Sequence, residues 1–123
     1  MNVEAAIKPV PRVFEGADSL TLRADTYGEA QQTSVILAHG GGQTRFAWGN
    51  TAVHLAAQGW YAVALDLRGH GESEWCPDGK YHLDYFAQDL LKVAAQCGGQ
   101  PAIVGASLGG MASMVAEGGL ANG

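Results

Sequence analysis

Three short apolar runs stand out along the chain, and each ends at a glycine-rich or polar segment. They are Ser34–Ala38, Trp60–Leu67 and Ala102–Gly105. Continuous apolar runs of this length are typical of strands that are buried on both faces of a sheet. Further upstream, Val10–Phe14 and Leu20–Ala24 flank a polar turn, which predicts a hairpin.

Helical periodicity fills the segments between and after these runs. Apolar residues recur at helical spacing from Trp48 to Ala56, from Leu83 to Ala94, and from Leu108 to Glu117. Right-handed crossovers between parallel strands place such helices on both faces of the sheet. The pattern therefore predicts one α/β domain over residues 1–123. Four large residues on the helical stripes are expected in the core: Trp48, Phe86, Met111 and Met114.

Composition and charge exclude several classes of protein. The 123 residues are 47% hydrophobic with a net charge of −5, and no cluster of Lys and Arg supplies the basic face that nucleic acid requires. No apolar run approaches the ~18 residues of a membrane span, and no secretory signal is visible. Cys76 and Cys97 lack metal or redox spacing, so we expect free thiols in the cytoplasm, with no metal and no cofactor.

The segment from Gly105 to Gly110 carries the most specific chemical signal. It matches the pattern G-x-S-x-G around Ser107, between a buried strand and a helix. In such a turn the serine hydroxyl projects clear of the sheet, and the flanking Gly105 and Gly109 avoid Cβ clashes. The N–H of Leu108 then lies where it can stabilise an oxyanion. The alternative is an ordinary turn in which Ser107 only caps the helix.

A glycine run follows the first of the three parallel strands. His39 is followed by Gly40, Gly41 and Gly42, where a second backbone N–H would complete an oxyanion hole. Neither phosphate-loop pattern, G-x-G-x-x-G or G-x-x-x-x-G-K-[ST], occurs in the chain. A nucleotide-binding domain therefore remains an analogy at the level of the fold alone.

Together, the segments His39–Arg45, Asp66–Ser73 and Gly105–Gly110 resemble the N-terminal half of an α/β-hydrolase, in the branch of esterases, cofactor-free haloperoxidases and C–C hydrolases. The resemblance implies an N-terminal hairpin followed by three parallel strands alternating with helices, with the later strands absent. A serine rather than an aspartate at position 107 argues against the branches of epoxide hydrolases and haloalkane dehalogenases.

The same resemblance assigns a role to each matching residue. Ser107 is the nucleophile, and the N–H groups of Gly41 and Leu108 are the oxyanion donors. The residues expected to support the turn and the glycine loop are His39, Gly40, Gly42, Gly105 and Gly109. The loop Asp66–Ser73, with Arg68, Gly69 and Gly71, is expected to be mostly structural.

Two partners of a catalytic triad cannot be assigned in this chain. In this fold an acid and then a histidine follow the serine. The four histidines, His39, His54, His70 and His82, all precede Ser107, and Glu117, expected to face solvent, is the one carboxylate after it. We expect His54 and His82 to be exposed and His70 to make structural contacts in its loop.

We therefore expect an incomplete hydrolase domain that acts on a small ester-like substrate when completed and is inactive alone. A non-catalytic fragment or interaction module is the alternative. An unpaired sheet edge is expected to promote self-association.

Overall fold

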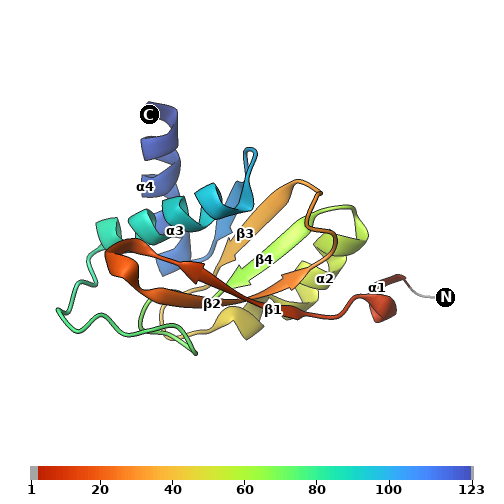
Figure 1. Cartoon of the computed structure of the whole chain (residues 1–123), viewed down its shortest axis with the longest axis horizontal. Coiled ribbons are helices and arrows are strands. Elements are labelled where there is room, and N and C mark those ends of the chain that lie inside the picture. The colour runs from red at the N-terminus through yellow and green to blue at the C-terminus, as the bar shows by residue number, and fades with distance from the viewer. Residues whose placement is uncertain (1–2, 123) are drawn as a thin grey trace.

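A five-stranded mixed sheet forms the centre of the molecule (Figure 1). The computed structural model describes residues 3–122, with side chains described for residues 3–116. The sheet order is β1-β2-β4-β3-β5. The strands are β1 (Val10–Glu15), β2 (Thr21–Tyr27), β3 (Ser34–Ala38), β4 (Tyr61–Leu65) and β5 (Ala102–Gly105).

Strand pairing confirms the predicted topology. β1 and β2 form the antiparallel hairpin, and β2 also pairs antiparallel with β4. β3 pairs parallel with both β4 and β5, so the three predicted buried strands are the parallel part of the sheet. The carboxyl ends of these three strands therefore meet at one edge, where ligands bind in open α/β sheets.

Helices cover both faces of the sheet, as the periodicity predicts. The helices are α1 (Val3–Ala6), α2 (Gly49–Ala57), α3 (Leu83–Cys97) and α4 (Leu108–Asn122), with 3-10 turns η1 (Ala17–Ser19) and η2 (Arg45–Trp48). The sequence pattern did not predict α1, η1 and η2. None of the helices in the described part of the chain is long and apolar enough to cross a membrane.

Alternation along the central strands divides the core into two clusters. Ile36 of β3 faces α3 and α4, where Phe86 and Leu90 are buried against it. Val35 and Leu37 of the same strand face α2 on the opposite side. Successive side chains of a strand point to opposite faces, so one apolar strand serves both helical layers. Phe86 is thus a core residue as expected, and Trp48 packs half-buried against the second cluster.

The expectation that Met111 and Met114 are core residues is wrong. Their exposed fractions are 57% and 74%. Helix α4 instead packs through Ala112 and Ala116, which are fully buried in the first cluster, because small side chains allow the helix to lie close to the sheet and to α3. The methionines lie on the other side of the helix, and β5 at the edge of the sheet leaves Val104 44% exposed.

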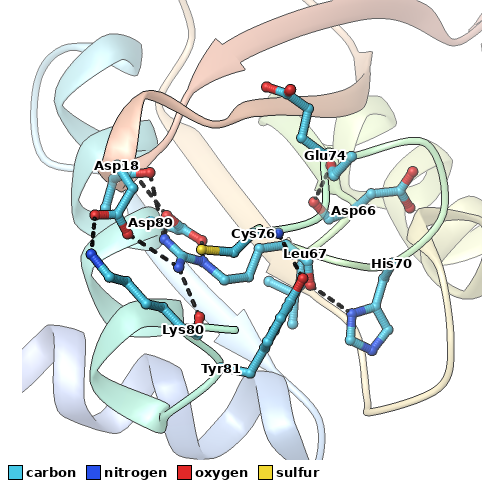
Figure 2. Close-up of polar contacts among 12 residues, drawn as sticks. Asp18, Asp66, Leu67, His70, Glu74, Cys76, Lys80, Tyr81 and Asp89 are labelled. Atoms are coloured by element: carbon cyan, nitrogen blue, oxygen red, sulfur yellow. Dashed lines mark hydrogen bonds and ion pairs between the residues drawn. The ribbon is translucent and has the colours of Figure 1, made fainter. Parts of the chain in front are cut away.

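A buried ion pair joins the loop after β4 to helix α3 (Figure 2). Arg68 is fully buried, and its Nε and Nη2 lie 2.7 and 2.8 Å from the two carboxylate oxygens of Asp89. These hydrogen bonds raise the pKa of Arg68 above its usual value, against the opposing effect of burial. The bidentate geometry fixes the loop against the helix.

The same pair organises the turn between β1 and β2. Asp89 also accepts a hydrogen bond from the N–H of Ala17 at 2.8 Å, and Arg68 Nη1 lies 3.3 Å from the carboxylate of Asp18. Arg68 Nη1 further donates to the carbonyl of Lys80 at 2.9 Å, and the Lys80 ammonium lies 3.4 Å from Asp18 (Figure 2). Three segments distant in sequence therefore meet at one guanidinium.

Removing one partner of this pair is expected to destabilise the protein strongly. The variant Asp89→Ala leaves a buried guanidinium without its carboxylate, which costs about 3–5 kcal/mol. Lys92→Ala on the same helix is the matched control, because it removes only an exposed ion pair with Glu15, worth about 0–1 kcal/mol. Urea unfolding of both variants measures the difference, and equal losses would contradict the assigned role of Asp89.

Exposed apolar side chains at β5 and α4 are expected to make the 123-residue chain self-associate or unfold with low cooperativity. Light scattering after size exclusion measures the first, and thermal unfolding the second. The double variant Met111→Glu, Met114→Glu is expected to reduce association, because it replaces apolar surface with charge. A monomer with a single sharp unfolding transition would show the prediction to be wrong.

Candidate active site

Ser107 occupies a strained turn between β5 and α4. Its φ is +54°, in the left-handed region that residues other than glycine seldom adopt. The turn is fixed by hydrogen bonds to the end of β3: the N–H of Ala106 donates to the carbonyl of Ala38 at 3.1 Å, and the N–H of Gly109 to that of His39 at 3.1 Å. The side chain of Ser107 is exposed at the carboxyl edge of the sheet.

The two glycines that flank the serine lie in close backbone contacts. A Cβ on Gly105 would lie 2.3 Å from the carbonyl oxygen of Gly109. A Cβ on Gly109 would lie 2.2 Å from the carbonyl oxygen of Ala38. Because neither backbone can retreat without breaking the turn, only glycine fits at both positions.

The glycine loop after β3 lies directly beside this turn. A Cβ built on Gly40 would lie 3.4 Å from the Cβ of Ser107, and one on Gly41 would lie 3.8 Å from that of Leu108. The loop is a tight turn in which the N–H of Gln43 donates to the carbonyl of Gly40 at 3.1 Å. The side-chain oxygen of Gln43 accepts in return from the N–H of Gly40 at 3.0 Å.

Two backbone N–H groups at this junction lack an acceptor among the residues that the structure describes. Within the described residues, nothing accepts a hydrogen bond from the N–H of Gly41 or from that of Leu108. Three nearby N–H groups are paired: Gly40 with Gln43, Gly42 with His70, and Gly109 with His39. Leu108 begins α4, so its N–H also carries the partial positive charge of a helix start. The pair is available to a ligand oxygen.

His39 is fully buried and connects the glycine loop to the loop after β4. Its Nδ1 lies 2.8 Å from the carbonyl oxygen of Gly40, so Nδ1 carries the proton. Its Nε2 then accepts a hydrogen bond from the N–H of Leu67 at 3.0 Å. Burial lowers the pKa of His39, which keeps the ring neutral. The two ring nitrogens of His39 thus join the glycine loop to the loop after β4.

His70 makes the reciprocal connection from the loop after β4. Its Nδ1 lies 2.9 Å from the carbonyl of Arg68 (Figure 2), and its Nε2 accepts from the N–H of Gly42 at 3.2 Å. The rings of His39 and His70 are 4.9 Å apart between centroids. Both ring nitrogens of each histidine are thus engaged with backbone groups, so neither is free to act as a base toward Ser107.

Asp66 directly follows β4 and holds the C-terminal end of the glycine loop. Its fully buried carboxylate accepts from the N–H of Arg45 at 2.6 Å and from the N–H of Glu72 at 3.0 Å. The Arg45 guanidinium also donates to Asp66 and pairs with Asp25 at 3.2 Å. Burial alone would lower the pKa of Arg45, but hydrogen bonds to Glu72 and Asp66 raise it. Gly71 is required here, since a Cβ on it would lie 2.3 Å from Asp66.

The supporting roles of Arg45, Asp25 and Asp89 were not predicted from the sequence. A signal existed for Asp89, since it lies within the apolar stripe of α3 between Phe86 and Val93 and is fully buried. No local signal marks Arg45 or Asp25, because their partners lie far away in the sequence.

The remaining candidates lie away from the turn. His54 is exposed and pairs with Glu4 at 3.2 Å, and His82 is exposed before α3, as expected for both. The side chain of Glu117 lies outside the described residues. Across the residues that the structure describes, no group of three or more His, Cys, Asp or Glu side chains could hold a metal ion.

The buried state of His39 predicts a pH dependence of stability. Its pKa is lower in the folded chain than the usual ~6.5 of the unfolded chain, so below that pH the unfolded state binds more protons. Stability is therefore expected to fall as the pH drops from 6.5 toward the folded pKa, by up to about 1.4 kcal/mol per pH unit.

Thermal unfolding between pH 7.5 and 5.0 measures this effect. His39→Gln keeps an acceptor for Leu67 but does not titrate, so its unfolding should depend less on pH in this range. An unchanged pH dependence in His39→Gln would contradict the assignment to His39.

A family model described as alpha/beta hydrolase fold matches residues 33–116. Esterase Rv0045c of Mycobacterium tuberculosis is 40% identical over 114 residues, which cover 92% of this chain and 36% of that protein. The Serine hydrolase-like protein of Danio rerio is 31% identical over 91 residues, covering 72% of this chain and 28% of its own length. The chain thus spans about a third of the length of these curated relatives.

Solved structures agree in fold. Epoxide Hydrolase A from Mycobacterium thermoresistibile matches with a TM-score of 0.82 and 26% identity over 89% of this chain and 34% of that one. The thioesterase domain from the curacin biosynthetic pathway matches with a TM-score of 0.80 and 28% identity over 88% of this chain and 40% of that one. The sheet topology, the turn at Ser107 and a family model that matches most of the sequence lead to one assignment: the chain belongs to the alpha/beta hydrolase family.

Proposed function

We propose that this chain carries the nucleophile and the oxyanion donors of a cytoplasmic serine hydrolase that acts on a small ester-like carbonyl substrate. The observation that carries the proposal is the junction at the edge of the sheet. Ser107 is exposed at a positive φ, and beside it the N–H groups of Gly41 and Leu108 have no acceptor within the described residues. Cys76 and Cys97 are both free, which favours a reducing compartment.

The proposed chemistry is acyl transfer. The Ser107 oxygen attacks the carbonyl carbon of the ester while a base takes the hydroxyl proton. The carbonyl π electrons move to its oxygen, and the N–H groups of Gly41 and Leu108 donate hydrogen bonds to the resulting oxyanion. Collapse of this intermediate expels the alcohol, which takes up a proton, and leaves an acyl ester on Ser107 that water hydrolyses.

The substrate class rests on the relatives and on the residue at position 107. The Mycobacterium tuberculosis relative is named an esterase and the curacin-pathway structure a thioesterase, and both names describe acyl transfer to a nucleophile. The Mycobacterium thermoresistibile structure is an epoxide hydrolase, so relatives with the same fold act on different bonds. A serine supports the acyl reaction, because it forms an ester that water can cleave.

A second candidate is a non-catalytic module that keeps the fold without turnover. It is favoured by the arrangement of the histidines. Both ring nitrogens of His39 and of His70 are bound to backbone groups. By this account the serine has no base within the chain.

Phosphonylation by a fluorophosphonate probe, followed by intact-mass measurement, separates the two candidates. We expect little labelling of the chain alone, because no base activates Ser107. Added imidazole supplies a general base from solution and is expected to raise the labelling rate about tenfold or more, since the oxyanion donors are already in place.

Two serine variants control this measurement. Ser107→Ala should abolish the imidazole-dependent adduct. Ser113→Ala should leave it unchanged, because the Ser113 hydroxyl is buried and donates to the carbonyl of Gly109 at 2.6 Å. Labelling that survives Ser107→Ala would contradict the proposal. Folded chain that stays unlabelled in imidazole would favour the non-catalytic module.

A further inference from the structure

His70 lies outside the strand-helix turn and the glycine loop, yet it holds a backbone group of that loop. Its Nε2 accepts the N–H of Gly42 at 3.2 Å, and its Nδ1 lies 2.9 Å from the carbonyl of Arg68. A carbonyl oxygen can only accept a hydrogen bond, so Nδ1 must carry the proton. The lone pair of Nε2 then faces the N–H of Gly42. The ring is half-buried, and it packs against His39 and, edge-on, against Phe86.

Gly42 directly follows Gly41, whose N–H has no acceptor within the described residues. Gly42 has a φ of +79°, and a Cβ on it would contact nothing within 4 Å, so packing does not restrain it. Peptide planes between glycines rotate easily, because no Cβ opposes the rotation. Hydrogen bonds must therefore hold the planes on either side of Gly41.

A different histidine binds each of the two peptide planes on either side of Gly41. The plane between Gly40 and Gly41 is held through the Gly40 carbonyl, which accepts from Gln43 N–H and from His39 Nδ1. In a trans peptide the N–H points opposite to the carbonyl, so this contact directs the N–H of Gly41 away from His39. The next plane, between Gly41 and Gly42, is held through the N–H of Gly42 by His70.

We propose that His70 is a positioning residue of the oxyanion site: by holding the N–H of Gly42 it fixes the chain on the C-terminal side of Gly41, so that the Gly40–Gly41 peptide, which carries the N–H of Gly41, keeps its place beside the oxyanion formed on the Ser107 adduct. This inference rests on the proposed function for the identity of the ligand oxygen. His70 acts through the backbone and does not touch the substrate.

The anchorage of His70 itself supports this role. Its Nδ1 binds the carbonyl of Arg68, whose side chain is fixed by the buried pair with Asp89. The ring is thus attached to the loop after β4, which the Arg68–Asp89 pair holds against α3, while the N–H that it accepts belongs to the loop after β3. Because His39 reaches in the opposite direction to the N–H of Leu67, the two loops fix each other.

A pair of amide variants tests the role of the Nε2 acceptor. His70→Asn can place a donor near the Nδ1 position but has no acceptor near Gly42. His70→Gln can place its amide oxygen near the Nε2 position and so restore the acceptor. His82→Asn is the matched control, because His82 is an exposed histidine with no side-chain hydrogen bond within the described residues.

Two readouts are measured on the 123-residue chain. Amide exchange by NMR should show the N–H of Gly42 exchanging about tenfold faster in His70→Asn, which corresponds to the loss of one ordinary hydrogen bond. The N–H of Ala106, bound to Ala38, is the internal reference and should not change. The imidazole-dependent labelling rate of Ser107 should fall about tenfold in His70→Asn. His70→Gln and His82→Asn should remain near the wild-type values in both readouts.

The outcomes separate this inference from the proposed function. Unchanged exchange of Gly42 in His70→Asn would overturn the inference, and so would labelling that falls equally in His70→Asn and His70→Gln. If the wild-type chain is not labelled, the proposed function fails, while the exchange of Gly42 still decides whether His70 holds the loop. If His70→Asn does not fold, a Gly42 exchange rate in His70→Gln near that of wild type supports the inference, and a tenfold faster rate overturns it.

Discussion

The contact on which the site depends is the approach of the Ser107 turn to the last carbonyl groups of β3. Gly109 lies so close to the carbonyl oxygen of Ala38 that a single methyl group would not fit, and its N–H donates to the carbonyl of His39. The positive φ of Ser107 persists because the backbone on both sides is held in this way. The same contact brings the start of α4 against the glycine loop, so that one constraint places the hydroxyl and two free N–H groups together.

Buried polar groups then fix the loops that surround this contact. Asp66 and Arg45 hold the end of the glycine loop, and Arg68 and Asp89 hold the loop after β4 against α3. Such pairs add little net stability relative to well-packed apolar residues, but a missing partner is costly. Because their geometry is bidentate or shared with backbone N–H groups, we interpret them as devices that specify loop positions. The geometry of this edge of the sheet thus depends on charged side chains that are mostly buried.

Much of the fold could be predicted from the sequence, because it follows from local patterns. The bounds of β3 and β5 match the apolar runs, and the glycines around Ser107 are required by the contacts that the motif implies. The prediction for Met111 and Met114 was wrong, because periodicity identifies an apolar face of α4 but not whether a neighbour covers it. The network around Arg45 and the pairing of His70 with Gly42 depend on segments brought together only by the fold, so no local pattern could reveal them.

The central claim is that the N–H groups of Gly41 and Leu108 receive the oxyanion formed at Ser107. The most direct measurement is a crystal structure of the chain after phosphonylation, in which the phosphoryl oxygen stands in for the oxyanion. The account predicts that this oxygen lies within about 3.1 Å of both backbone nitrogens, with Ser107 still at a positive φ. A phosphoryl oxygen directed to solvent, or bound by neither nitrogen, would contradict it.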